Sequence, residues 1–431
     1  MIGILLIFQP LIVALVGRYP DAELLVKRSE ELFILFAFGV VFFRNIVFEK
    51  RWFRTGIEIP VLLLVAIAVA GSLKNRIVPA HLAAFDLMLL LKGFMVYYIA
   101  YSLRPDIGEI SFSLRILLGV GLFILFLGFA DLVSPATFAN MLRDAEPTEY
   151  RFGIPSISSM LFHPGAFGGL MAFFGCFSLA YYLVMKSPRY LGIAALFFAG
   201  VFFSARVKPI VGIMCACLVP IMVLPVKKRV NFILLLALLL LITANIIGPK
   251  VGVLFHDKIY DYFQGPRAGN FARNVLYSTS LRLAKDFFPF GSGLGTFGGW
   301  VAALYYSPIY AIYGIDNVLG LERGGKFLTD TFWPYIVGQF GYLGLACYLW
   351  IIAAIFMRLA RAYKRSSLDA VRAFIIGTLM IFTEALVESI AEPVFLKPPL
   401  FFLIFACVGV SLSLSDARIN GQGPEEGGSH A

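Results

Sequence analysis

Long apolar segments are the feature that most limits what this chain can fold into. A helix needs about 20 apolar residues to cross the hydrocarbon core of a bilayer, and twelve runs come close to that length. They are 2–17, 32–48, 57–73, 83–103, 116–133, 166–185, 191–205, 209–226, 230–248, 333–357, 373–390 and 398–414. Only 14% of the residues are charged, against about 25% in an average soluble domain. The sequence therefore predicts an all-α polytopic membrane protein with about twelve transmembrane helices.

Clusters of Lys and Arg between the predicted spans indicate their orientation. The clusters at 49–54, 186–189, 227–229 and 358–365 fall on one side if every predicted span crosses the membrane. The positive-inside rule assigns that side, with both chain ends, to the cytoplasm. The first segment has no basic start and no small-x-small cleavage site, so it is interpreted as a span and not as a signal peptide.

The predicted spans divide the chain into four parts. Residues 1–248 carry helices one to nine, 249–332 form a large external loop, 333–414 carry helices ten to twelve, and 415–431 form a disordered cytoplasmic tail. Within the loop, the apolar stretch 296–314 begins with glycines and contains several tyrosines. We expect it to lie at the membrane interface or to re-enter the membrane, and not to cross it.

Several kinds of site are not expected from the composition. All five cysteines lie inside apolar stretches, which is typical of buried residues and not of a disulfide framework or a zinc cluster. The four histidines show no metal-ligand spacing, so we predict neither a metal nor a cofactor. The net charge of +10 is expected to gather in loops, and nucleic acid is not an expected partner.

Two cations, Arg206 and Lys208, occupy a very short external turn in the stretch FFSARVKP. One interpretation is that both side chains reach lipid headgroups from the ends of their spans. The other depends on Pro209, which suits the first turn of the next helix and leaves both cations just before the helix N-terminus. Since helix N-termini bind anions, this second interpretation predicts phosphate binding at the outer membrane surface.

Residues 271–286 of the large loop fit an amphipathic helix. Arg282 and Lys285 share one face by the i, i+3 rule. Arg273 is rotated about half a turn around the helix axis and therefore lies on another face. We therefore expect Arg273 and Arg282 to have different partners. The following GSGLG resembles a phosphate-binding loop, but it follows no strand and precedes no clear helix, so it is predicted to be a turn.

Acidic residues lie on the same predicted external side. Glu384, Glu388 and Glu392 recur every four residues and therefore share one helical face. Carboxylates inside a span are costly and are functional candidates; the alternative is that they neutralise buried arginines. Asp330 precedes the tenth span, where its alternative role is a helix N-cap. Three further charged residues lie inside predicted spans: Arg44, Asp86 and Lys92. We expect them to pair within the helix bundle and assign them no further role.

The order of these features resembles the bacterial O-antigen polymerase and ligase superfamily, the integral membrane glycosyltransferases of the Wzy and WaaL type. The resemblance covers roughly residues 145–360. Its motifs are RFGIPSISSMLFHPGAFGG before a span, SARVKP at the end of another, RNVLYSTSLRLAKDFFPFGSGLGTF in the large loop and DTFWPYIVGQFGYLGL at the next span. The ten residues between Arg282 and Gly293 match an arginine–x10–glycine pattern of the polymerases.

The resemblance implies a GT-C-like fold in the bacterial inner membrane, with the large loop and the active site facing the periplasm. It also implies that periplasmic arginines hold the diphosphate of an undecaprenyl-linked glycan donor. The residues assigned to the diphosphate are Arg206, Lys208, Arg273 and Arg282, and those assigned to the glycan or acceptor are Arg151 and His163. For His163 the alternative is a histidine that simply lies at the membrane interface.

One departure from the family favours a polymerase over a ligase. Ligases carry a histidine near the start of the span after the large loop, where this chain has Asp330. Ligases also carry an acidic residue further along the chain, and Glu384 or Glu388 matches that residue in type and position. We predict a metal-independent O-antigen or exopolysaccharide polymerase, in which one of these carboxylates takes the acceptor proton. The alternatives are a ligase to lipid A core or protein and a lipid-glycan transporter or flippase. Expected partners are the lipid-linked donor and acceptor, membrane lipids and a chain-length regulator.

Overall fold

The computed structural model describes residues 2–16, 20–49, 55–135, 150–151, 154–223 and 271–419. Helices hold 77% of these residues, in agreement with the predicted all-α class. The described part also contains one short antiparallel pair, formed by β1 (Tyr150–Arg151) and β2 (Ile154–Pro155).

Seven helical stretches in the described residues are long and apolar enough to cross a membrane. The first is Arg28–Phe48, formed by the end of α2 (Pro20–Phe43) and the π-helix η1 (Arg44–Phe48). The others are α3 (Glu58–Asn75), α4 (Ala80–Leu103), α5 (Ile107–Val133), α7 (Pro164–Met185), α15 (Trp333–Arg365) and α16 (Asp369–Glu388). The shorter apolar helices are α1 (Ile2–Val16), α8 (Pro188–Phe203), α9 (Val207–Ala216) with α10 (Leu218–Val223), and α17 (Leu400–Ile419). These helices indicate a membrane-embedded protein.

The predicted spans overlap these helices, apart from 230–248, which lies outside the described residues. α17 continues to Ile419, past the predicted end of the last span at 414. Within the predicted loop region 249–332, α12 (Ala272–Asp286) is the expected amphipathic helix. The apolar stretch 296–314 forms only α13 (Trp300–Tyr305) and α14 (Ile309–Ile312), and neither is long enough to cross a bilayer.

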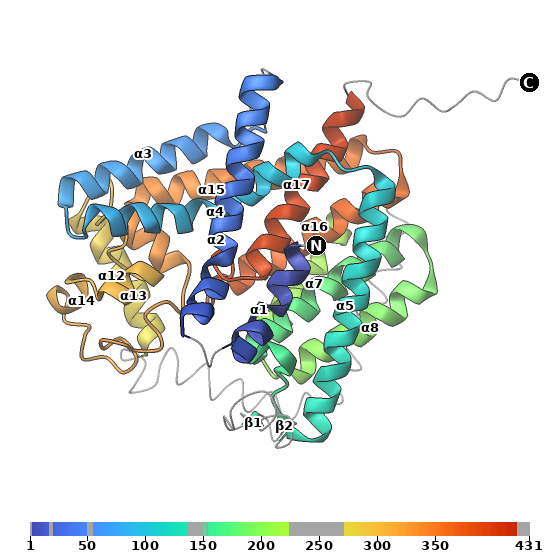
Figure 1. Cartoon of the computed structure of the whole chain (residues 1–431), viewed down its shortest axis with the longest axis horizontal. Helices are drawn as coiled ribbons and strands as arrows, with labels where there is room; N and C mark the ends of the chain where they lie inside the picture. Colours follow the sequence, from blue (N-terminus) through green and yellow to red (C-terminus); the bar gives the residue numbers. More distant parts are fainter. Residues whose placement is uncertain are drawn as a thin grey trace, which may run out of the picture.

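Figure 1 shows two groups of helices. In one group α3, α4 and α15 lie side by side, with α12, α13 and α14 gathered at one end. In the other group α7 packs against α8, α9 and α16. α17 packs against α4, α15 and α16 and so joins the two groups.

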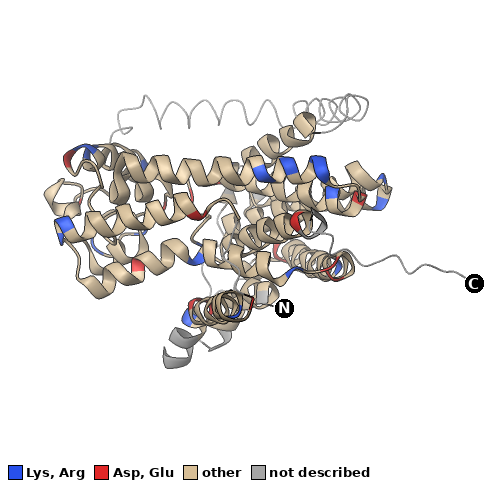
Figure 2. Cartoon of the chain, turned by 90° about the horizontal axis from the view of Figure 1, so that it is seen from above, with Lys and Arg blue, Asp and Glu red and all other residues tan. Residues whose placement is uncertain are grey.

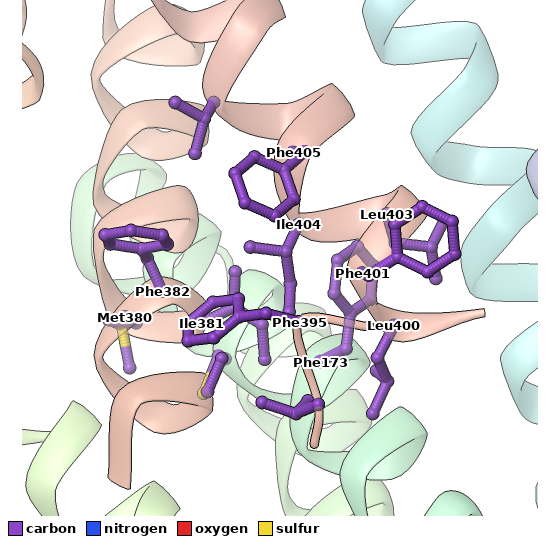
Figure 3. Packing of buried hydrophobic residues seen from close by; sticks show 14 of the residues in the cluster. Phe173, Met380, Ile381, Phe382, Phe395, Leu400, Phe401, Leu403, Ile404 and Phe405 are labelled. Atoms are coloured by element: carbon purple, nitrogen blue, oxygen red, sulfur yellow. The ribbon is translucent and has the colours of Figure 1, made fainter. Parts of the chain in front are cut away.

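Phenylalanines hold the loop between α16 and α17 against the bundle. Phe395 of this loop is 3% exposed, and its ring centroid lies 5.9 Å from that of Phe382 and 6.0 Å from that of Phe405. Figure 3 shows these side chains together with neighbours from α7. Phe332, just before α15, packs on Phe395 at 5.3 Å. Because burial of a phenylalanine side chain is favourable by about 1.5–3 kcal/mol, these contacts fix the loop in place.

The glycine-rich turn at 291–299 is wholly buried. The Gly293 N–H donates to the Gln339 carbonyl oxygen at 2.9 Å. The Gly295 N–H donates to the Asp86 carboxylate at 3.0 Å and to the Gln339 side-chain oxygen at 2.9 Å. Because protein groups already accept from these N–H groups, the segment is a structural turn and not a phosphate-binding loop, as its sequence context predicted.

Gly291→Ala is expected to destabilise the fold by about 3 kcal/mol or more, because this turn meets a break in α15. Gly291 has φ +75°, and a Cβ there would lie 2.4 Å from the Gly341 nitrogen. In the matched control Gly314→Ala, φ is +65° and no atom lies within 4 Å, so only backbone strain of about 1 kcal/mol remains. Thermal unfolding of the solubilised protein measures both, and equal shifts would contradict this account.

Candidate functional site

The loop that follows α16, residues 389–399, is contacted by several helices. The Trp333 indole N–H, at the start of α15, donates to Ser389 Oγ at 3.0 Å. The Tyr277 hydroxyl of α12 donates to the Ile390 carbonyl at 2.7 Å. A third contact comes from Lys208 of α9, which donates to the Ala391 carbonyl. We call this loop, with the side chains that surround it, the loop site.

Glu392 lies between two lysines at the loop site. Lys208 Nζ of α9 lies 2.8 Å from Glu392 Oε2 and also donates to the Ala391 carbonyl. Lys397 Nζ lies 2.7 Å from Glu392 Oε1. Burial would raise the pKa of Glu392, but the two ammonium groups outweigh burial and lower the pKa to about 2. Glu392 is therefore ionised at neutral pH and is shared by two cations.

The ion pairs of Glu392 with Lys208 and Lys397 are expected to stabilise the folded chain at neutral pH but not in acid. The pKa of Glu392 is about 2 in the folded chain, below its ordinary value of 4.5. The unfolded chain therefore binds the proton more tightly, so the contribution is complete above about pH 4.5 and disappears as the pH falls toward 2. Glu392→Gln should be less stable than the wild type at pH 7, with the difference narrowing between about pH 5 and pH 3. Thermal unfolding across that range checks this, and a difference independent of pH would contradict it.

Arg206 and Lys208 lie at the N-terminus of α9, in electrostatic reach of His163. Arg206 is the N-cap residue, whereas Lys208 lies inside the first turn and not in the preceding loop as the sequence predicted. His163 is the N-cap of α7, and its Nδ1 accepts the Ala166 N–H at 3.4 Å. Loss of surrounding water lowers the pKa of His163, and cations including Arg206 and Lys208 lower it further against the opposing effect of Glu392. The neutral ring then carries its proton on Nε2, as a hydrogen-bond donor.

Arg273 and Asp330 form an ion pair beside these contacts. Arg273 Nε lies 2.7 Å from Asp330 Oδ2, and Nη2 also contacts that oxygen. Arg273 lies one helical turn before Tyr277, which contacts the 389–399 loop. The N-cap of α15 is Phe332, so Asp330 does not take the N-cap role considered as an alternative. Both side chains are partly exposed to solvent.

Glu384 and Glu388 lie deeper in α16, at 0% and 2% exposure. In the described part of the chain, no hydrogen-bond donor outside this pair reaches either oxygen of Glu384 or Oε2 of Glu388, and neither residue pairs with an arginine there. Glycines make room for both: a Cβ on Gly212 would lie 3.1 Å from Glu384 Oε1, and one on Gly169 would lie 3.2 Å from Glu388 Oε2. Buried carboxyls without partners are costly, which makes this pair a functional candidate.

Arg282 is not brought to the loop site. Arg282 lies on the exposed face of α12, and its guanidinium carbon lies 5.1 Å from the centre of the Tyr313 ring. Arg273 and Arg282 therefore have different partners, as predicted. The backbone of Arg151 belongs to β1, and its side chain lies outside what the structure describes.

Three residues of the loop site were missed by sequence reasoning: Lys397, Tyr277 and Trp333. Lys397 lies in the same loop as Glu392, five residues further on, so its charge was a usable signal. The other two contact a segment far away in the chain. No local sequence pattern around Tyr277 or Trp333 indicates which residue it contacts.

In the described residues, no group of three or more His, Cys, Asp or Glu side chains is arranged to hold a metal ion. No protein-family model matches the chain, and no curated protein matches it. The loop site combines cations, carboxylates that pair with them and buried carboxyls, and such cations can stabilise negative charge on phosphate groups.

Proposed function

We propose that this protein is a polysaccharide polymerase, which transfers a lipid diphosphate-linked glycan to a lipid-linked repeat unit. One observation carries the proposal: Arg206, Lys208 and Arg273 belong to, or lie beside, one site that also contains carboxylates. The site lies at the ends of apolar helices, where the diphosphate of a membrane-anchored substrate would also lie.

The proposed reaction forms one bond and breaks one. The acceptor hydroxyl oxygen bonds to the anomeric carbon of the donor glycan, and the bond between that carbon and the diphosphate oxygen breaks. The electron pair leaves on the diphosphate, where Arg206 and Arg273 would stabilise it by charge-assisted, often bidentate hydrogen bonds. The hydroxyl proton passes to a carboxylate. Lys208 would add positive charge beside the leaving group.

Asp330 is the best-placed acceptor for that proton. It pairs with Arg273, one of the groups assigned to the leaving diphosphate, and its side chain is partly open to solvent. Glu388 and Glu384 are enclosed in α16. The helix ends at Glu388, so Glu392 lies in the following loop and does not share the helical face that the spacing of the three glutamates predicted. We therefore assign the proton first to Asp330 and retain the two buried glutamates as the alternative. His163 is retained for glycan or acceptor binding, because its Nε2–H suits a sugar hydroxyl.

The proposal includes the setting of the reaction. The loop site would face the periplasm from a bacterial inner membrane, and both substrates would carry undecaprenyl diphosphate. Membership in the O-antigen polymerase and ligase superfamily belongs to the same proposal, as does a chain-length regulator as partner. A ligase would use the same donor and site but transfer the glycan to lipid A core or to protein.

A lipid-glycan transporter or flippase is a second candidate. The observation that favours it is the pair Glu384 and Glu388, which is buried within a candidate span. Ionisable groups inside the membrane are frequent in substrate and proton pathways. A transporter would move the lipid-linked glycan across the bilayer without forming a glycosidic bond.

The glycan phenotype of a strain lacking this protein tests the proposal. Loss of polymer with single repeat units retained is the expected result for a polymerase. Free polymer that is no longer attached to its acceptor would show a ligase instead. Accumulation of lipid-linked repeat units on the cytoplasmic side alone would favour the transporter. Restoration by the wild-type chain is the control for each outcome.

A further inference from the structure

A basic surface lies at the opposite end of the bundle from the loop site. α15 begins at Trp333, which contacts the loop site, and ends at Arg365. Figure 2 shows Lys and Arg gathered toward one end of this long helix. We call the surface formed by Arg361, Lys364 and Arg365 the α15 basic face. All three side chains are exposed.

None of the three cations of the α15 basic face forms an ion pair with a residue that the structure describes. The spacing i, i+3, i+4 places the three cations on one side of the helix. Neighbouring basic side chains do have acidic partners: Arg358 lies 3.0 Å from Asp416, and Arg372 lies 4.0 Å from Asp369. Three cations close together repel one another, so binding of an anion to this face is favourable.

The position of the α15 basic face along its helix places it near a membrane surface. α15 has no charged residue from Trp333 until Arg358. At about 1.5 Å per residue this stretch, which includes the break at Gly341, covers up to about 37 Å, against a hydrocarbon core of about 30 Å. The cations that follow would therefore emerge at the depth of lipid headgroups.

We propose that the α15 basic face binds the headgroups of anionic phospholipids. Charge complementarity supports this occupant, because phosphates in the plane of the membrane surface would face the three cations. Exposed apolar side chains adjoin the face: Met357 is 54% exposed and Leu368 is 38% exposed. They would contact acyl chains, which a soluble anion does not have. This inference does not depend on the reaction proposed for the loop site.

The test measures lipid binding to the full-length purified protein in detergent, by native mass spectrometry and thermal unfolding. The wild type is expected to bind phosphatidylglycerol in preference to phosphatidylcholine, and added salt should weaken that preference. The triple variant Arg361→Gln/Lys364→Gln/Arg365→Gln should bind phosphatidylglycerol about tenfold more weakly, or weaker still. Its binding of phosphatidylcholine should not change.

Two further variants make the result specific. The matched control Lys285→Gln/Arg323→Gln/Lys326→Gln removes three exposed cations from the large loop and should keep the preference. The variant Arg361→Lys/Arg365→Lys keeps the charge and should retain lipid binding. Unchanged lipid preference in the α15 triple variant, or an equal loss in the control, would overturn the proposal. Displacement of the lipid by equimolar glycerol phosphate would also overturn it, because the face would then be a site for soluble phosphate.

Discussion

Replacing Arg206 with alanine is expected to slow polymer formation by roughly 100- to 1000-fold, which is typical when a group that stabilises transition-state charge is removed. Arg206 is the N-cap of α9 and acts electrostatically on His163 beside the Glu392 ion pairs. In the proposed reaction its guanidinium contacts the diphosphate as negative charge develops there. The measurement is the initial rate of chain extension in membranes that contain equal amounts of each protein.

Two variants separate this role from a general loss of charge. Lys285→Ala removes an exposed cation near the end of α12 and should leave the rate unchanged. Arg206→Lys should recover part of the rate, because an ammonium keeps the charge but loses the two-pronged hydrogen bonding of a guanidinium. A wild-type rate in Arg206→Ala would contradict the assignment of this residue to the diphosphate.

Lys92→Met is expected to lower the free energy of unfolding by about 3–5 kcal/mol, because it leaves a buried carboxylate without its partner. Lys92 Nζ of α4 lies 2.8 Å from Glu30 Oε1 of α2, and the two side chains are only 4% and 3% exposed. The same ammonium lies 4.4 Å from the centre of the Phe401 ring of α17. The pair therefore ties three helices together. Thermal or denaturant unfolding of the solubilised protein measures the loss.

The double variant Glu30→Leu/Lys92→Met supplies the control. Replacing both partners by apolar side chains removes the unpaired charge, so most of the lost stability should return. A double-mutant cycle with Glu30→Leu alone then gives the coupling energy of the pair. If the single and double variants were equally unstable, the loss would come from packing around Lys92 and not from the ion pair.

Helix positions were largely predictable from the sequence, because run length and flanking charge decide which segments suit a bilayer. Segments such as 57–73 and 333–357 lie on α3 and α15 for this reason. Residues 296–314 show that an apolar stretch of similar length does not always form a span. Glycines and a proline divide this apolar stretch, and the structure forms two short helices there.

The partners of buried charges were not predictable, because they depend on contacts between distant segments. Lys92 pairs with a residue 62 positions away, and Asp86 accepts an N–H from a turn 209 positions away. The break in α15 at Gly341 lies against the same turn, since a Cβ on Gly341 would lie 2.8 Å from the Gly291 nitrogen. No local pattern in the sequence contains this information.

In the candidate site, too, the positions of charges along the chain were predictable, whereas their individual partners were not. Charge placement on one predicted side suggested that the glutamates lie beside the cations, and Lys208 does pair with Glu392. It did not show that Glu392 pairs with two lysines while Glu384 and Glu388 stay buried. That distinction depends on where α16 ends, and the sequence alone places such an end only to within a few residues.

The proposed reaction is tested in liposomes that contain the purified protein and undecaprenyl diphosphate-linked repeat units. We expect lipid-linked glycans of increasing length, with one undecaprenyl diphosphate released for each glycosidic bond formed. Both products should fall together in Arg206→Ala. Movement of the intact substrate across the bilayer, with no longer glycan and no released undecaprenyl diphosphate, would contradict the account.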